Sequence, residues 1–187
     1  MIMSKIDFRA LAKFALVTRL YPCYTGLAGK TLLEVEKMYT KAWLLGEDGE
    51  KKEIVSFGPI CVAPQYQRQG LSRLLIEHSF ARARELGYDV DINFGNPANY
   101  VGRGFVSCKK KNVCLGKDHF PTALLVCELI PNALGGKRWQ FIPSDADACC
   151  EDTAAVEAFD ATFPPKERAW KPSQEEFYIY SHSSVVC

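Results

Sequence analysis

The sequence predicts a single domain of the α/β class, more specifically of the α+β kind. Its 187 residues fit one domain, since domains commonly hold ~100 to 200 residues. Hydrophobic residues make up 48% of the chain and charged residues 24%, as in ordinary globular proteins, which excludes disorder. Several short segments show the composition or alternation of strands, and one long segment shows the spacing of a helix.

The first third of the chain is expected to form a helix followed by two paired strands. Residues 4–15 begin with a capping box and carry apolar residues at helical spacing. Residues 32–45 are rich in apolar and aromatic side chains, and an Asp-Gly turn leads from them towards residues 53–62, which predicts an antiparallel hairpin. Gly58 and Pro59 interrupt the second strand, so we expect it to be kinked or splayed there.

The middle of the chain predicts a long helix followed by short strands. Apolar residues mark one face of a helix over residues 69–86, which Gly87 closes. Residues 88–94 alternate Val, Ile and Phe with Asp and Asn, the period of a strand, and a short helix is expected around residues 98–102. A run of lysines at residues 109–111 is expected to form a solvated hairpin turn. Three further strands are expected over residues 104–108, 112–115 and 122–130.

The last part of the chain predicts an acidic extension over residues 143–187 that packs on a domain formed by residues 1–142. The extension carries nine acidic residues against three basic ones. Asp152 or Thr153 can cap a helix that runs to about Phe159. Two prolines then stop this helix, and the remainder is expected to be irregular.

Charge and hydropathy exclude two classes of partner. The formal net charge is +1 and no basic stripe runs along the chain, so no nucleic acid is expected to bind. The longest apolar stretch, residues 123–130, is far shorter than the ~18 residues of a membrane helix, so no membrane association is expected.

The cysteines and the start of the chain bear on metal binding and on the compartment. Eight cysteines occur without a C-x-x-C pair and without a histidine at zinc spacing, so no metal is expected. Arginine and lysine recur near the start, which leaves no uncharged segment typical of a secretory signal. We therefore expect a cytoplasmic protein with reduced thiols.

A glycine-containing turn between the kinked strand and the long helix is the first candidate for chemistry. It carries Gln67, Gly70 and Ser72, with Arg68 and Arg73 as nearby cations. Such a turn presents backbone N–H groups at a helix N-terminus, where unpaired donors and the positive end of the helix dipole bind phosphate. The arginines add charge opposite a pyrophosphate. Taken alone, the segment fits an ordinary strand-to-helix connection better.

A second motif follows one helix and one strand later, where Tyr100 stands four residues before Gly104 and Phe105. A strand, the Gln-x-x-Gly-x-Ser turn, a long helix, a strand and then Tyr-x-x-x-Gly-Phe resemble, in this order, the GNAT superfamily of acyl-CoA-dependent N-acyltransferases. The resemblance is closest to its YhbS-like group of predicted acetyltransferases, and it covers about residues 38–175. It also rests on four short segments, residues 38–41, 57–59, 94–97 and 163–167.

The resemblance implies a GNAT-like fold with a central, mostly antiparallel mixed sheet, a splayed and kinked strand, and flanking helices. In the family the turn holds the pyrophosphate of acetyl-CoA, which is therefore the expected cosubstrate, and the strand before the turn pairs with its pantetheine arm. Ser72 stands where the family usually has Gly or Ala. The cofactor-binding residues that follow are Ile60, Cys61, Val62, Gln67, Arg68, Gln69, Gly70, Leu71, Ser72, Arg73 and Asn96.

The resemblance also implies that Tyr100 is the catalytic residue. A tyrosine at this offset commonly donates a proton to the departing CoA thiolate. The alternative is that Tyr100 is an aromatic wedge that packs a short helix on the sheet. The acceptor amine must lose a proton before it attacks, and Glu53, Asp91 and His119 are the candidate bases, although each is expected to be a surface charge.

The function implied is an N-acetyltransferase that moves an acetyl group from acetyl-CoA to a primary amine on a small molecule or peptide. The rival is a non-catalytic acyl-CoA-binding or regulatory module, because residues 1–37 do not resemble the part of the family that lines the acceptor pocket. A homodimer is compatible with either. We further expect the acidic extension to cover the acceptor side and favour a cationic amine. An extension kept for solubility is the alternative.

Overall fold

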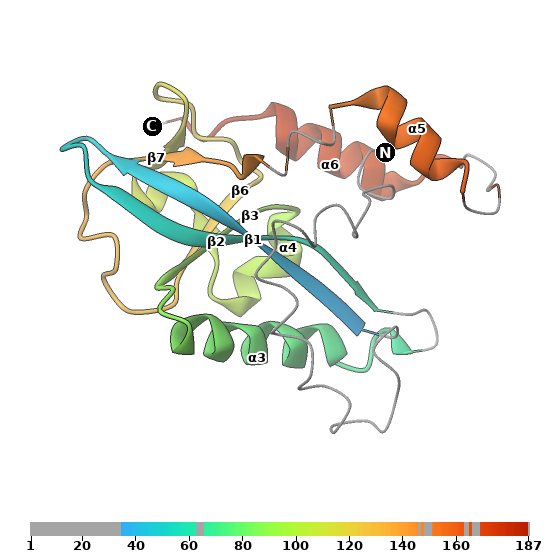
Figure 1. The fold of residues 1–187 in the computed structure, drawn as a ribbon, viewed down its shortest axis with the longest axis horizontal. Coiled ribbons are helices and arrows are strands. Elements are labelled where there is room, and N and C mark those ends of the chain that lie inside the picture. The colour runs from blue at the N-terminus through green and yellow to red at the C-terminus, as the bar shows by residue number, and fades with distance from the viewer. Residues whose placement is uncertain are drawn as a thin grey trace.

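One mixed sheet organises the part of the chain that the computed structural model describes, residues 35–62, 66–145, 147, 151–162, 165 and 169–186. The helix expected over residues 4–15 lies outside these residues. Within them, seven strands form the sheet (Figure 1). In spatial order they are β4 (Val106–Ser107), β6 (Leu124–Glu128), β3 (Val90–Phe94), β2 (Lys51–Val62), β1 (Val35–Gly46), β7 (Trp139–Ile142) and β5 (Val113–Leu115).

Most neighbouring strands in this sheet run antiparallel, which confirms the expected mixed, mostly antiparallel sheet. The exceptions are β2 with β3 and β5 with β7, which pair in parallel. A parallel pair needs a crossover, and the helix α3 (Leu71–Glu85) supplies it between β2 and β3. Gly70 precedes this helix with a φ of 80°, and Gly87 follows it with a φ of 90°. The positive φ of Gly87 agrees with the prediction that this glycine ends the helix.

Helices lie on both sides of the sheet (Figure 1). α3 lies on one side, and α5 (Thr153–Asp160) and α6 (Pro172–His182) lie on the other. Two short segments, α4 (Pro97–Tyr100) and the 3₁₀ turn η4 (Val101–Arg103), follow β3 where the sequence predicts a short helix. No helix in the described part of the chain is long and apolar enough to cross a membrane.

Two apolar clusters fill the two faces of the sheet. The cluster under α3, here named the α3-side core, contains Tyr39, Val55, Phe57, Ile76, Phe80, Ala83, Tyr88, Phe105, Leu125, Cys127 and Leu129. The cluster on the opposite face, here named the far-side core, contains Ala42, Leu44, Ile54, Val90, Ile92, Cys108, Val113, Cys114, Phe120, Leu124, Val126, Leu134, Trp139 and Phe141. Every strand except β4 gives side chains to these cores, so the sheet is buried on both faces.

The β1–β2 hairpin is kinked where the sequence predicts it. Lys37 pairs with Ile60 and Tyr39 with Phe57, so β2 has one more residue than β1 between the two pairs. The extra residue falls at positions 58–59, the Gly-Pro step. A bulge of this kind bends the strand and increases its twist, so the second half of β2 is directed away from the first.

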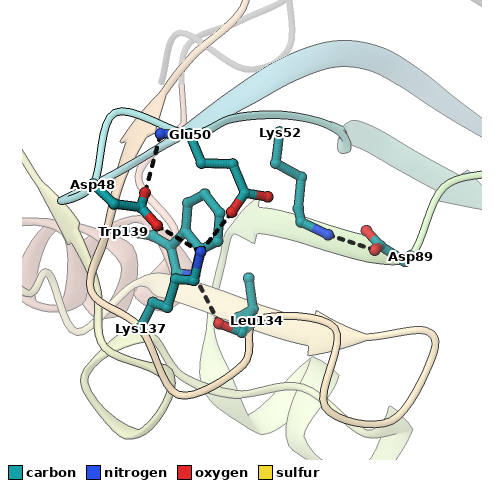
Figure 2. Close-up of polar contacts among 7 residues, drawn as sticks. All are labelled: Asp48, Glu50, Lys52, Asp89, Leu134, Lys137 and Trp139. Atoms are coloured by element: carbon teal, nitrogen blue, oxygen red, sulfur yellow. Dashed lines mark hydrogen bonds and ion pairs between the residues drawn. The ribbon is translucent and has the colours of Figure 1, made fainter.

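The closed end of the hairpin is held by surface contacts with the loop before β7. Figure 2 shows Lys137, whose Nζ donates to Asp48 Oδ2 and to Glu50 Oε2, both at 2.6 Å. Beneath it, Trp139 Nε1 donates to the carbonyl oxygen of Leu134 at 2.9 Å. These contacts fix the turn and the start of β7 against each other.

The lysine run does not form the expected hairpin turn. It belongs to a 3₁₀ helix, η5 (Cys108–Lys111), which connects β4 at one edge of the sheet with β5 at the other. Ser107 Oγ accepts a hydrogen bond from Lys109 N at 3.3 Å and so caps the turn. Lys109 lies over the Phe120 ring, and Lys111 pairs with Glu128 at 2.5 Å. Lys109 and Lys111 therefore contact other side chains and are not fully solvated.

The end of the chain is more regular than expected. Asp152 caps α5 as predicted, and its Oδ1 accepts from Ala155 N at 3.0 Å. The remainder, expected to be irregular, contains α6, which begins at Pro172. α6 is followed by backbone hydrogen bonds to the segment before β6, from Thr122 N to Ser183 O at 2.9 Å and from Val185 N to Phe120 O at 2.9 Å.

Candidate functional site

The two central parallel strands separate in the middle of the sheet. β2 pairs with β3 only through Val55 and Ser56, which lie opposite Asp91 and Ile92. Beyond Ser56, β2 continues to Val62 alongside β1, past the bulge, without further pairing to β3 in the described residues. This is the splayed strand that the resemblance implies, and it leaves backbone groups of β2 facing a gap.

Three predicted cofactor contacts lie on the separated part of β2. Ile60, Cys61 and Val62 form its last residues and pair with β1 on one edge. The side chains of Ile60 and Val62 are half-buried. Their position agrees with the predicted strand before the turn, since the edge opposite β1 can pair with an extended ligand.

The predicted phosphate turn follows β2. Gln67 Nε2 donates to the carbonyl oxygen of Val62 at 2.9 Å, so this side chain ties the turn to the end of the strand. Arg68 has φ of 60° and Gly70 has φ of 80°, and both are exposed. A Cβ added at Gly70 would meet no atom of the described residues within 4 Å. The space above Gly70 is therefore open to a ligand.

The start of α3 leaves backbone donors at this turn. Arg73 N and Leu74 N donate to Gly70 O at 3.0 and 3.2 Å, and Gly70 gives the helix no side-chain cap. The N–H groups of Leu71 and Ser72 precede these first bonds, and such groups at the positive end of a helix dipole suit an anion. The turn therefore places the predicted residues 67–73 together as an exposed anion site.

Of the two arginines at this site, Arg73 already has a partner. Its Nε donates to Glu77 Oε1 at 2.6 Å one helical turn further on. Arg68 and Gln69 lie exposed in the turn itself. Arg68 is therefore the better placed cation for a phosphate group.

Tyr100 lies at the end of α4, against the separated part of the sheet. Its ring packs edge-on against Phe57 at 5.5 Å and against Phe105 at 5.8 Å between centroids. A Cβ added at Gly95 would lie 2.5 Å from Tyr100 Cε2, so only glycine allows the ring to sit there. Burial, and then the negative charge of Asp91, raise the pKa of Tyr100. The hydroxyl therefore stays protonated at neutral pH.

Asn96, the remaining predicted cofactor contact, has structural partners. It caps α4, since its Oδ1 accepts from Ala98 N at 2.9 Å. Its Nδ2 donates to Glu176 Oε2 of α6 at 3.1 Å. The structure thus connects Asn96 with the C-terminal extension. Asn96 itself lies one helical turn before Tyr100.

A buried polar cluster below the gap was missed by the sequence analysis. Lys37 Nζ donates to Tyr39 Oη at 2.6 Å and to Ser79 Oγ at 2.9 Å. Tyr39 in turn donates to Asp91 Oδ2 at 2.9 Å, and Lys37 Nζ lies 3.5 Å from the same oxygen. Lys37 Nζ also lies 3.9 Å from the centroid of the Phe57 ring. A cation and an anion are therefore enclosed together in the α3-side core.

Asp91 is not the surface charge that its alternating pattern suggested. Its side chain is 0% exposed, because β3 is a central strand between β2 and β6 and is covered on one face by α3. Burial raises the pKa of Asp91 to about 6, and burial lowers the pKa of Lys37 to about 8. A strand that follows a helical crossover is commonly buried on both faces, and that rule is the signal that could have found Asp91.

The other two candidate bases lie in different surroundings. Glu53 accepts from Tyr88 Oη at 2.9 Å and pairs with Lys41 Nζ at 2.8 Å. The Lys41 hydrogen bond lowers the pKa of Glu53, which makes it a weaker base. His119 is exposed in the loop before β6, as expected. Within the described residues, no group of three or more His, Cys, Asp or Glu side chains could hold a metal ion.

The fold is similar to that of a solved structure. The chain is similar to the GNAT family N-acetyltransferase YhbS from Escherichia coli in complex with CoA, with 23% identity and a TM-score of 0.54. That match covers 61% of this chain and 62% of the YhbS chain, so it spans less than two thirds of that protein. A GNAT family acetyltransferase from Brucella melitensis in complex with acetyl-CoA has 15% identity and a TM-score of 0.44, over 76% of this chain and 95% of that one.

The fold class is therefore that of the GNAT N-acetyltransferases. The likeness to YhbS confirms, at the level of the fold, the resemblance that the two motifs indicate. No protein-family model and no curated protein sequence matches the chain.

Proposed function

We propose that this protein is an N-acetyltransferase that moves an acetyl group from acetyl-CoA to a primary amine. One observation supports this most strongly: β2 leaves β3 between an open anion site at one end and the Tyr100 ring at the other. A ligand with a phosphate group and an extended polar arm fits this arrangement. The YhbS structure was determined with CoA and the Brucella melitensis structure with acetyl-CoA.

The length of the separated strand agrees with such a ligand. Phe57, which packs against Tyr100, and Val62, at the start of the turn, are five residues apart in β2. At ~3.3 Å per residue this is at most about 17 Å, comparable with an extended phosphopantetheine arm. The pyrophosphate would then lie at residues 67–73 and the thioester near Tyr100.

In the proposed reaction the neutral amine attacks the acyl carbon and the carbon–sulfur bond breaks. Tyr100 donates its proton to the departing thiolate, which its raised pKa allows because the hydroxyl remains protonated. The amine loses one proton and the sulfur gains one. Donation to a charge that develops in a dry site stabilises the transition state more than the same bond does in water.

The acceptor in this proposal is a cationic amine on a small molecule or peptide. Glu176 of α6 bonds to Asn96, the cap of the helix that carries Tyr100. The acidic extension therefore lies beside α4 and can attract a positive acceptor from solution. Such attraction weakens with salt, since the Debye length is ~10 Å at 0.1 M.

Cofactor binding is tested first by thermal melting with acetyl-CoA. At a hundredfold excess over Kd a ligand stabilises the folded state by about 2.7 kcal/mol, so the wild type should melt at a higher temperature. Gly70→Glu should abolish the shift, because it places a carboxylate against the phosphates. Gly70→Ala is the matched control, since it carries the same backbone strain at φ of 80° without the charge. A wild type that shows no shift contradicts the proposal.

Catalysis is tested by acetyl transfer to a panel of cationic and neutral amines. Tyr100→Phe should lower kcat by ~10² to 10⁴ while leaving the Kd for acetyl-CoA unchanged. Tyr88→Phe is the control, because it removes the same hydroxyl from a tyrosine that bonds to Glu53 and Lys41 beyond the C-terminal end of α3. Binding of acetyl-CoA without transfer to any amine would instead support the non-catalytic binding module.

A further inference from the structure

Three groups stand in a row along one face of β3. Side chains two residues apart in a strand share a face, so Asp91, Asn93 and Gly95 all face the α3 side. Gly95 continues this alternation, because its N–H donates to Ala123 O at 3.0 Å and extends the β3–β6 pairing by one residue. The Tyr100 ring occupies the space that a side chain at Gly95 would fill. The row is therefore a carboxylate, an amide and a phenol.

The carboxylate and the amide in this row have buried polar atoms without partners among the described residues. Asp91 is 0% exposed and Asn93 is 1% exposed. Asp91 Oδ2 is bound by Tyr39 and Lys37, whereas Asp91 Oδ1 is unpaired. Both Asn93 Oδ1 and Asn93 Nδ2 are unpaired as well. These three atoms lie beside the place where β2 leaves β3.

Unpaired buried polar atoms destabilise a fold. The buried Asn93 amide therefore indicates a role other than stability. Residues two apart in a strand are ~6.6 Å apart, beyond the ~3 Å reach of a direct hydrogen bond. One water molecule spans about twice that reach and makes about three hydrogen bonds to groups of this kind. Asn93 offers both a donor and an acceptor at the middle of the row.

We propose that Asn93 holds a water molecule against Asp91 Oδ1, on the side of Tyr100, and that this water makes Asp91 the proton acceptor of the reaction. The inference rests on the proposed acetyl transfer and adds the missing base to it. Asn93 acts through the water and is a positioning residue. Asp91 also acts through the water, since it is enclosed.

The proton balance of this step closes within the site. The attacking amine forms its bond to the acyl carbon and gives a proton through the water to the Asp91 carboxylate. Tyr100 gives its proton to the sulfur as the carbon–sulfur bond breaks. The carboxylic acid at Asp91 then returns its proton through the same water to the Tyr100 phenolate. Starting from the neutral amine, the net change is one proton moved from nitrogen to sulfur, and a cationic acceptor releases its first proton to solvent before it attacks.

The charges around Asp91 suit this role. Neighbouring groups are Lys37 and Tyr39 on β1, Val55 and Phe57 on β2, Ser79 on α3, Cys127 on β6 and Tyr100 on α4. Lys37 is the cation that keeps the carboxylate charged in spite of its burial. Burial raises the pKa of Asp91 to about 6, which is closer to that of an effective base at neutral pH than an exposed carboxylate would be.

The water is tested directly by a high-resolution crystal structure of the whole protein without ligand. Ordered density within hydrogen-bond distance of both Asp91 Oδ1 and the Asn93 amide is expected. A site that is dry at this position overturns the inference, whatever the protein catalyses.

The relay is tested by Asn93→Leu, which keeps the volume but removes both polar atoms. A fall in kcat of at least ~10-fold is expected, with unchanged acetyl-CoA affinity. The decline in kcat expected of the wild type below about pH 6 should be lost as well. In a Tyr100→Phe background the same change should cost less than in the wild type, because the return of the proton from Asp91 to Tyr100 is then already lost. Thr40→Val is the control, since it removes a buried hydroxyl on the opposite face of the sheet.

Three outcomes separate the relay from the function on which it rests. If the wild type transfers acetyl groups and needs Tyr100, but Asn93→Leu keeps the wild-type kcat and pH profile, only the relay is wrong. Equal losses from Asn93→Leu in both backgrounds also overturn the relay, because they show that no proton passes from Asp91 to Tyr100. If the wild type transfers nothing to any amine, the proposed function fails and the relay fails with it.

Discussion

The two faces of β3 are equally buried, but they are built from opposite kinds of side chain. Val90 and Ile92 face the far-side core and pack there among its apolar side chains. Asp91 and Asn93 face the α3-side core, where a charged pair and unpaired amide atoms are enclosed. Polar groups are costly to bury, so the α3 side of β3 is not built for stability alone. The difference points to the face on which chemistry takes place.

Among the changes that test this contrast, the loss of one charge on the α3 side is expected to lower stability most. Asp91→Leu leaves Lys37 as an uncompensated buried cation, and breaking a buried pair in this way costs about 3 to 5 kcal/mol of unfolding free energy. Urea denaturation with a constant m-value would measure it.

The matched control removes both charges. Combining Asp91→Leu with Lys37→Met should recover most of the loss, since buried pairs are often replaced by apolar groups at little cost. If the double variant is as unstable as Asp91→Leu, shape rather than charge governs this site.

The same double variant is the reference for measuring how the Asp91–Lys37 pair makes the free energy of unfolding depend on pH. Burial raises the pKa of Asp91 to about 6, above the ~3.9 of an unfolded chain, so the folded state binds the proton more tightly. The stability contributed by this group is therefore present below about pH 4 and lost as pH rises through about 6. Burial lowers the pKa of Lys37 to about 8, so its contribution is regained as pH rises from about 8 towards ~10.

Measured against the double variant, the wild type should thus be least stable between about pH 6 and 8. A flat difference across this range, from denaturation curves at each pH, would show that neither group titrates as its burial demands.

On the apolar face of β3, a substitution lowers the free energy of unfolding by leaving a cavity rather than an unpaired charge. Ile92→Ala should lose roughly 2 to 5 kcal/mol, because Ile92 is wholly buried in the far-side core. Ile92→Val should lose only ~0.5 to 1.5 kcal/mol and serves as the control. Neither change should alter the pH profile of acetyl transfer. A changed profile would mean that the two faces are coupled.

A smaller loss of stability is expected at the end of the row. Gly95→Ala places a Cβ 2.5 Å from Tyr100 Cε2, so the ring must move. Overpacking of this kind costs ~1 to 3 kcal/mol. Transfer activity should fall with it although Tyr100 itself is intact. Gly102→Ala is the control, since a Cβ there meets no atom within 4 Å. Full activity of Gly95→Ala would show that the ring position is not critical.

The smallest effect is expected at the closed end of the hairpin. Lys137→Met removes the ion pairs to Asp48 and Glu50 shown in Figure 2 but keeps the apolar stem over Trp139. Exposed pairs contribute little and are screened by salt. We expect a slight fall in melting temperature that disappears at high salt. A large fall that salt does not change would mean that the contacts of the Lys137 ammonium hold the turn more strongly than exposed, screened ion pairs can.

Much of the fold could be predicted from local patterns in the sequence. The hairpin, the kink at residues 58–59, α3 with its glycine ends and the cap of α5 at Asp152 all follow from turn, cap and period signals. β7 and α6 were missed for local reasons. β7 is four residues long, and the apolar residues of α6 at positions 177–180 are consecutive rather than spaced along one face.

The buried cluster could not be predicted in the same way. Lys37 and Asp91 lie far apart in the chain, and each is typical of a solvated surface when it is read alone. Only the order of the strands, which places β3 between β2 and β6, shows that its alternating polar residues, Asp91 and Asn93, face a core. The positions of the turn at residues 67–73 and of Tyr100 were predictable, because a motif specifies local geometry. Their roles in cofactor binding and catalysis stay predictions.

The two edge strands have a consequence for how copies of this protein meet. β4 spans two residues and β5 spans three, so each edge of the sheet presents few free backbone groups to a neighbour. The lysines of η5 lie directly between these two strands in the chain and place positive charge next to both edges. Short, charged edges are a means of preventing strand-to-strand aggregation. Pairing of either edge with the sheet of a second copy is therefore not expected.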